Sequence, residues 1–186
     1  MRTMLTRNRG WIGPAVALMT GLAAAGLAAA DEAATHELVS FETRRLSDRF
    51  FSEGAAAGDL DGDGHADIIA GPFWYAGPDF ATRHELFEPT PFDPHGYSDC
   101  FFQFVHDIDG DGDSDVVVYG FPGQQGWWLE NPGPADAAAG HWLRHLALDV
   151  IDNESPQWID ITGNGRPEIV CSVGGCFGYA SIPTDN

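Results

Sequence analysis

A nine-residue acidic pattern that occurs three times restricts the fold of this chain more than any other feature. In residues 59–67 and 107–115, aspartate occupies positions 1, 3, 5 and 9, and glycine occupies positions 4 and 6. A degraded copy in residues 160–168 keeps both glycines and has oxygen-bearing side chains at the same four positions. Glycine readily adopts the positive φ angles that curl a backbone into a tight loop. We therefore expect three loops that each gather oxygen atoms.

The oxygen atoms of the first two loops indicate calcium sites. Ca²⁺ takes about 6–8 oxygen ligands in a flexible cage. Without a cation, two carboxylates ~4 Å apart repel by about 4 kcal/mol at an effective dielectric constant of ~20. The alternative is a solvated acidic turn. The predicted ligands include the backbone carbonyl at position 7 and are Asp59, Asp61, Asp63, His65 and Asp67 in the first loop, and Asp107, Asp109, Asp111, Asp113 and Asp115 in the second.

The third loop carries less negative charge. Its candidate calcium ligands are Asp160, Thr162, Asn164 and Glu168. Thr162 and Asn164 are neutral, and Arg166 at position 7 adds a positive charge. For this loop both interpretations stay open, a third calcium site and a solvated turn.

The N-terminal residues have the pattern of a secretory signal peptide. Arg2, Arg7 and Arg9 precede an apolar stretch, residues 11–30, which ends in three alanines before Asp31. The alternative is a membrane anchor, because 20 residues are long enough to cross a bilayer, but so many alanines and glycines would make a weak one. We expect a signal peptide at residues 1–30 and one repeat domain at residues 31–186, in a protein that is secreted, periplasmic or attached to the cell surface.

The charge of the chain disfavours two classes of partner. It has 28 acidic and nine basic residues, a net charge of −19, and every basic residue is arginine. Removal of residues 1–30 would take away three arginines and no acid. Such a surface repels nucleic acid and anionic membranes. We therefore expect no nucleic-acid partner, and no membrane span once the signal is cleaved.

The three cysteines leave two interpretations open. Cys171 and Cys176 are close enough in sequence to pair in an oxidising compartment, which would leave Cys100 over. Alternatively, all three are small buried hydrophobic residues. No spacing of cysteine and histidine indicates zinc.

Short β-strand patterns repeat with a period close to that of the acidic loops. Residues 101–106, 115–119, 126–130 and 141–150 are predicted strands of one unit, and residues 54–58, 67–70, 73–76 and 83–87 are those of the unit before it. The last unit has strand patterns at 157–159, 168–171 and 177–179, and a segment of the fourth-strand type, residues 36–41, precedes the first unit. Four strands in about 50 residues are typical of a propeller blade. We predict an all-β fold, a β-propeller-like array of about three four-stranded blades that is incomplete, either an open arc or part of a larger propeller.

The loops do not fit the EF-hand, which needs a bidentate glutamate at position 12 between two helices. Position 12 is Ala70 in the first copy and Val118 in the second, both within predicted strands. A calcium loop of the dockerin type also leads into a helix, and no helical periodicity follows either loop.

Residues 59–75 resemble an FG-GAP repeat of the VCBS type, as found in the calcium-bearing blades of integrin α-subunit propellers. Residues 107–133 resemble another, and residues 127–133 are similar to the aromatic–Glu–Asn–Pro–Gly strand end of bacterial secreted members. Three such repeats cover roughly residues 35–180. The resemblance implies a secreted β-propeller with calcium held by the loop residues given above. The family usually has about seven blades, so this chain departs from it in length.

Two functions are compatible with these features. One is a calcium-binding module for adhesion, whose propeller face binds a protein or a glycan and which associates with further blades or with itself. Its aromatic residues Trp74, Tyr75, Trp127, Trp128 and Trp142 would then either stack on sugar rings or pack between blades. The other is a fragment of a polysaccharide lyase or hydrolase on a propeller scaffold. Its candidate catalytic residues are His95, Tyr97, Asp99 and His106.

Overall fold

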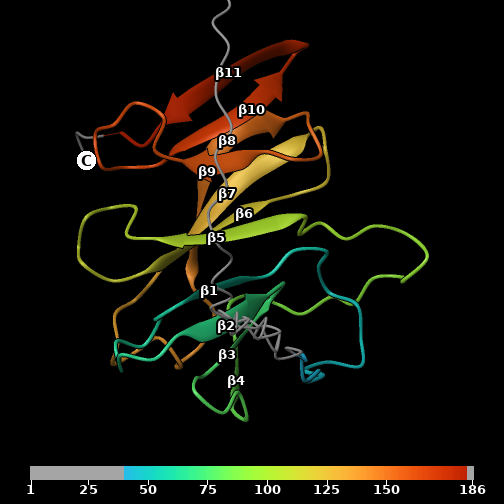
Figure 1. The fold of residues 1–186 in the computed structure, drawn as a ribbon, viewed down its shortest axis with the longest axis vertical. Coiled ribbons are helices and arrows are strands. Elements are labelled where there is room, and N and C mark those ends of the chain that lie inside the picture. The colour runs from blue at the N-terminus through green and yellow to red at the C-terminus, as the bar shows by residue number, and fades with distance from the viewer. Residues whose placement is uncertain (1–39, 184–186) are drawn as a thin grey trace, which may run out of the picture. The chain divides into compact units, whose positions relative to one another are not determined.

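The computed structural model describes residues 40–183, which form eleven β-strands and no helix (Figure 1). The chain divides into two units, residues 1–42 and 43–186, and all of the strands belong to the second unit. The predicted signal peptide and most of the predicted strand at 36–41 lie outside the described residues. Within residues 40–183 no helix is long and apolar enough to cross a bilayer.

The strands form three antiparallel sheets, each with its strands in chain order. The first consists of β1 (Ala56–Gly58), β2 (Asp67–Ala70), β3 (Phe73–Tyr75) and β4 (Arg83–Glu85). The second consists of β5 (Phe102–His106), β6 (Asp115–Tyr119), β7 (Gln124–Glu130) and β8 (Leu143–Ile151). The third consists of β9 (Gln157–Ile159), β10 (Glu168–Val173) and β11 (Cys176–Ser181).

We refer to these sheets as the first, second and third blades. The predicted all-β, propeller-like array is confirmed. The third blade has three strands, as the sequence pattern predicted, and the described residues do not close into a ring. The eleven strands that were predicted between residues 54 and 179 are all present, with boundaries that move by no more than two residues.

Each acidic loop occupies the same place in its blade, between the first and second strands. The loops connect β1 to β2, β5 to β6 and β9 to β10. Position 9 of each loop is therefore the first residue of the second strand, which lies in the middle of the blade and pairs with a neighbour on both sides. This placement fixes the last carboxylate of the pattern to an interior strand of the blade.

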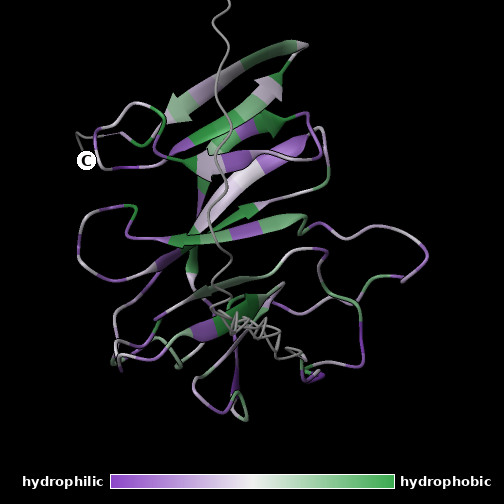
Figure 2. Cartoon of the chain, viewed as in Figure 1, coloured by the Kyte–Doolittle hydropathy of each residue, from purple (hydrophilic) through white to green (hydrophobic). Residues whose placement is uncertain are grey.

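The hydrophobic core lies between successive blades. Val116 and Val118 of β6 pack with Leu60, Ile69 and Trp74 of the first blade. Because successive side chains of a strand point to opposite faces, the intervening Val117 faces the third blade, where a second cluster contains Ile169 and Cys171. In Figure 2 the hydrophobic residues lie mainly on the strands, and the connecting loops are mostly polar.

Position 2 of the first two acidic loops is part of this packing. Leu60 is 1% exposed and packs into the interface between the first two blades, and Ile108 is 7% exposed and packs into the interface between the second and third. The equivalent Ile161 of the third blade is 48% exposed. The first two acidic loops therefore lie where one blade meets the next.

Most of the predicted sugar-stacking residues are core residues. Trp74, Tyr75, Trp127 and Trp142 are buried. Trp128 is half-buried, with the ring of His145 stacked on it at 4.4 Å between centroids. Of the two roles open to these aromatic residues, the structure supports packing.

All three cysteines are free. Cys100 and Cys171 are buried, which agrees with the prediction that they are small core residues, whereas Cys176 is exposed. The pairing of Cys171 with Cys176 is absent because β10 and β11 pair Val173 with Cys176 and place Cys171 opposite Gly178.

Candidate metal centre

Backbone hydrogen bonds to the position 1 carboxylate curl each acidic loop. In the first loop Gly62 N and Gly64 N donate to the two carboxylate oxygens of Asp59, both at 2.9 Å. Gly62 and Gly64 have φ angles of 72° and 86°, which glycine adopts without steric cost. The glycines at positions 4 and 6 of the other two loops also have positive φ. The three loops therefore share one conformation.

The second loop has the same hydrogen bonds. Gly110 N donates to Asp107 Oδ1 at 2.7 Å, and Gly112 N donates to Asp107 Oδ2 at 3.1 Å. These donors hold the carboxylate in one orientation. A carboxylate oxygen has two lone pairs, so each keeps one that is free to face a cation.

The position 9 carboxylates are buried at the base of the loops. Asp67 Oδ2 accepts from Leu60 N at 2.8 Å, and Asp67 Oδ1 accepts from Gly77 N at 2.9 Å. Burial raises the pKa of Asp67 above its ordinary value, and the two backbone donors partly offset this effect. Each of these carboxylates thus joins the loop to the second strand.

Asp115 repeats this arrangement in the second blade. Its Oδ2 accepts from Ile108 N and its Oδ1 accepts from Asn131 N, both at 2.8 Å. Burial raises the pKa of Asp115 to about 6, despite the lowering effect of these two donors. Asp109 and Asp111 raise it further through their negative charge. A bound cation would favour the ionised form of this buried acid.

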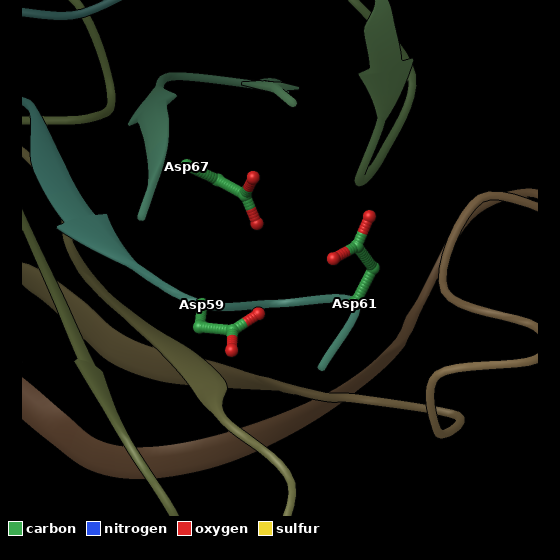
Figure 3. Close-up of side chains that lie close together, drawn as sticks. All are labelled: Asp59, Asp61 and Asp67. Carbon is green, nitrogen blue, oxygen red and sulfur yellow. The ribbon is translucent and has the colours of Figure 1, made fainter. Parts of the chain in front are cut away.

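Three carboxylates converge in each of the first two loops. Those of Asp59, Asp61 and Asp67 face a common space (Figure 3), and one oxygen from each lies within 4.8 Å of the others. Asp107, Asp109 and Asp115 form an equivalent group. Two oxygens bound to one Ca²⁺ at about 2.4 Å lie at most about 4.8 Å apart. The donor set and its spacing therefore fit calcium.

The position 5 aspartates lie outside these close groups. Asp63 Oδ1 accepts from His65 N at 2.8 Å, and Asp111 Oδ1 accepts from Asp113 N at 2.9 Å. Their carboxylates thus stabilise the turn that leads to position 7. The predicted roles of Asp63, Asp111 and the carbonyl groups of His65 and Asp113 as ligands stay predictions.

The third loop keeps the conformation of the others but has a different centre. Asp160 accepts from Gly163 N at 2.7 Å and from Gly165 N at 2.8 Å, and its pKa is lowered, chiefly by the bond from Gly165. The buried Glu168 accepts from the Thr162 hydroxyl at 2.8 Å. The side chain amide of Asn164 also donates to Glu168, at 3.4 Å. Thr162 and Asn164, two of the predicted ligands, thus donate hydrogen bonds to Glu168, which is another.

Sequence reasoning missed a residue that joins the second blade to the first loop. Asn131 is 3% exposed, and its side-chain amide donates to Leu60 O and Ser114 O, both at 2.9 Å. It therefore links the position 2 carbonyl of the first loop to the second blade. The signal that marks it is its place in the Glu–Asn–Pro–Gly sequence at the end of β7.

Arg166 of the third loop has the equivalent role at the boundary between the second and third blades. Its guanidinium donates to Ile108 O at 3.0 Å, the position 2 carbonyl of the second loop. Position 7 was predicted to contribute only its backbone carbonyl. The structure gives the side chain of Arg166 a role in joining blades.

The predicted catalytic residues do not assemble into one site. His95, Tyr97 and Asp99 are exposed on the loop that precedes β5, whereas His106 is the last residue of β5, next to the second acidic loop. Five residues of a strand span about 13 Å. His106 is half-buried beside Trp158, and burial lowers the pKa of His106. The four candidates thus lie near one another in sequence but not in one site, and the alternative of an enzyme fragment stays a hypothesis.

Comparison with protein families found two matches. A model described as an FG-GAP-like repeat matches residues 107–171, and one described as an FG-GAP repeat matches residues 51–81. Together the matched segments contain all three acidic loops and just over half of the chain. Comparison with curated proteins and with solved structures found no match.

Proposed function

This chain belongs to the FG-GAP repeat family, and from that premise we propose that it is a secreted β-propeller-like module whose blades are held in place by calcium. Asp59, Asp61 and Asp67 would bind one ion, and Asp107, Asp109 and Asp115 a second. Asp160 and Glu168, with Thr162 and Asn164, are the residues proposed for a third, weaker site.

The observation that supports this proposal most directly is the repeated carboxylate group. Two consecutive blades bring three carboxylates together at the same point of the fold, with oxygens no more than 4.8 Å apart. Acidic side chains placed so close repel one another unless a cation or a proton is shared between them. The burial of the position 9 aspartates follows from their backbone hydrogen bonds, so it is the convergence of three carboxylates that favours a cation over a solvated acidic turn.

Calcium, when bound, would neutralise the three carboxylates and link loop to strand. The chain's own residues would then connect the ordered loop to the next blade. Position 2 of the same loop packs into the interface between blades, and its carbonyl group accepts from Asn131 or Arg166 of the following blade. Calcium affinity and blade packing are therefore coupled.

A direct test is titration of the purified, chelator-treated chain with Ca²⁺ in a calorimeter. We expect two strong sites per chain. Asp61→Ala and Asp109→Ala should each remove one site, and Asp136→Ala, which changes the same charge at an exposed position outside the loops, should remove none. No heat of binding at millimolar Ca²⁺, or loss of both sites with Asp136→Ala, would contradict the proposal.

We further propose that the chain is exported and that residues 1–30 are removed as a signal peptide. Export places the module where calcium is at millimolar concentration, in the range that extracellular sites bind. Its partners would be a protein or a glycan. N-terminal sequencing of the protein recovered from the medium or periplasm of an expressing cell should begin at Asp31. A start at Met1 in the membrane fraction would identify an anchor instead.

A further inference from the structure

The third blade ends in an exposed edge strand. The first two blades have four strands each, and their third strands, β3 and β7, pair on both sides. Of the residues that the structure describes, only those of β10 pair with β11, the third strand of the last blade (Figure 1). Two side chains of β11 are largely exposed, Phe177 at 75% and Tyr179 at 57%. An apolar strand with a free edge is a template for pairing with a further strand.

In both complete blades a histidine of the fourth strand covers a tryptophan of the third. His84 of β4 lies opposite Trp74 of β3, and their rings are stacked with centroids 4.4 Å apart. His145 of β8 lies opposite Trp128 of β7, and their rings are also stacked at 4.4 Å. The fourth strand therefore adds both a row of hydrogen bonds and an aromatic stack to its blade.

Tyr179 is the equivalent of these two tryptophans. It pairs with Val170, which lies two residues after position 9 of the third acidic loop. Trp74 and Trp128 pair with the residues at the same place in their own blades. By register, a fourth strand of the last blade would place its histidine opposite Tyr179.

The segment of the fourth-strand type, residues 36–41, contains a histidine in the matching sequence. Residues 36–38 read His-Glu-Leu, as do residues 84–86, which include the end of β4. Phe41, the last residue of the segment, is 94% exposed. His36 is therefore the candidate partner of Tyr179.

The segment lies too far from β11 of its own chain to pair with it. Leu46 packs against Phe73 and Tyr75, which alternate along β3 with Trp74 and so face away from the second blade. Since packed sheets lie about 10 Å apart, the third blade is about 30 Å from Leu46. The seven residues from Leu46 back to Val39 span at most about 25 Å. The strand must then come from another molecule.

We propose that residues 36–41 of one copy of this chain pair antiparallel with β11 of a second copy and complete its third blade. His36 then lies opposite Tyr179 and stacks on its ring, and Leu38 lies opposite Phe177. Each copy offers one strand and one free edge, so a reciprocal exchange between two copies satisfies both edges of a closed dimer. This interaction goes beyond the calcium sites and does not depend on them.

The first test is the effect of a proline in the exchanged strand on self-association. Leu86 N donates to Pro72 O at 2.8 Å, and Leu38 has the place of Leu86 in the matching sequence. Because proline has no backbone N–H, Leu38→Pro removes the equivalent donor. By sedimentation we expect the purified chain to form a dimer, and Leu38→Pro to weaken self-association at least tenfold. The control is Arg44→Pro, at an exposed position outside the strands, which should change little.

The second test is a disulfide between the two paired strands. The register places Val39 opposite Cys176, which is free and exposed. Residues opposite each other in an antiparallel pair have Cα atoms about 4.5–5.5 Å apart, a distance that a disulfide spans. With oxidised glutathione, Val39→Cys should form a disulfide with Cys176 of a second copy, seen as a covalent dimer on a non-reducing gel.

Two control variants make this second test specific. Ser40→Cys places the new thiol on the opposite face of the strand. Val39→Cys/Cys176→Ser removes the partner thiol. Both should give little covalent dimer, and peptide mapping identifies the linked cysteines.

Four results would overturn the inference. They are a monomeric unmodified chain, an equal loss of self-association with Arg44→Pro, a disulfide that links Val39→Cys to Cys176 within one chain, and no more covalent dimer with Val39→Cys than with Ser40→Cys. Calcium titration of the same samples separates this failure from failure of the proposed function. Two calcium sites on a monomeric chain would refute only the strand exchange, and exchange without calcium sites would refute only the calcium module.

Discussion

Asp115 has two roles that oppose each other in the absence of a cation. Its carboxylate accepts from Ile108 N and Asn131 N, which joins the second acidic loop to the start of β6 and to the residue that follows β7. It is also buried close to Asp109, which raises its pKa. Asp67 has the same two roles in the first blade. A residue that stabilises the fold by its hydrogen bonds thus destabilises it by its charge until the charge is neutralised.

A pH prediction follows from the raised pKa values of Asp67 and Asp115. The folded chain binds the Asp115 proton up to about pH 6, whereas the unfolded chain loses it near the ordinary value of 3.8. The contribution of Asp115 to stability is therefore complete below pH 3.8 and lost as the pH rises through about 6. In chelator, the free energy of unfolding should increase from pH 7 to pH 5. The increase in the free energy of unfolding that Ca²⁺ causes should become smaller from pH 7 to pH 5.

Urea titrations at pH 5, 6 and 7, with chelator and with Ca²⁺, measure both trends. The control is Asp136→Ala, which removes an exposed acid and should leave the slopes unchanged. A chelated protein that loses stability on acidification to pH 5 would contradict the expected trend, in which the effect of the two buried acids exceeds the opposing effect of His106, whose pKa is lowered by burial.

A second residue-scale prediction concerns Asn131. Its truncation to alanine leaves the Leu60 and Ser114 carbonyl groups without their donor. Since an unsatisfied buried polar group costs about 1–3 kcal/mol, Asn131→Ala should lower the free energy of unfolding by at least ~2 kcal/mol. Chemical denaturation measures the loss. Gln125→Ala, which truncates an exposed amide of the preceding strand β7, is the control, and equal effects of the two substitutions would contradict the assigned role.

The elements themselves were predictable because their patterns are local. A glycine-punctuated loop followed by an aspartate and β-branched residues, as in residues 107–119, carries the information for both loop and strand. The strand boundaries differ from the predicted ones where pairing with a neighbouring strand determines the length of a strand. Strand β7 starts two residues before Gly126 because Gln124 pairs with Ile151 of the long strand β8, and that register is not visible in β7 alone.

The close approach of the first strands of the first two blades gives an element-scale prediction. A Cβ added to Gly58 of β1 would lie 2.5 Å from Val105 Cγ1 and 2.9 Å from Val105 Cβ, of β5. The branched side chain cannot move away without shifting the strand. Gly58→Ala should therefore destabilise the protein by about 1–3 kcal/mol, as overpacking does in cores.

The matched control is Gly140→Ala. A Cβ at Gly140 meets no other atom within 4 Å, so this substitution should change stability little or raise it slightly. Thermal and chemical unfolding compare the two variants. If Gly58→Ala is as stable as the unmodified chain, β1 and β5 do not pack as closely as the structure has them.

For the molecule as a whole, the sequence predicted which residues carry chemistry better than it predicted where they lie. The acidic loops were identifiable because spacing within nine residues defines their geometry. The aromatic residues were not, because burial depends on contacts between blades. Trp127 and Trp142 are core residues, whereas Tyr97 and Phe121, from segments more than 20 residues apart, are exposed and lie with their ring centroids 5.3 Å apart. Asn131 and Arg166 likewise act across a blade boundary.

In the function proposed above, cations held by the acidic loops stabilise the packed blades. At a Ca²⁺ concentration ten times the dissociation constant, each site adds about 1.4 kcal/mol to the free energy of unfolding. Two sites should therefore raise the melting temperature by roughly 6–11 °C, given about 2–4 °C per kcal/mol for a chain of this size.

The most direct measurement is the thermal unfolding of the purified chain in chelator and in millimolar Ca²⁺, with the Asp61→Ala/Asp109→Ala double variant measured beside it. We expect one cooperative transition that calcium moves upward in the unmodified chain and moves little or not at all in the double variant. A melting temperature that is the same with and without Ca²⁺, or a shift of equal size in the double variant, would contradict it.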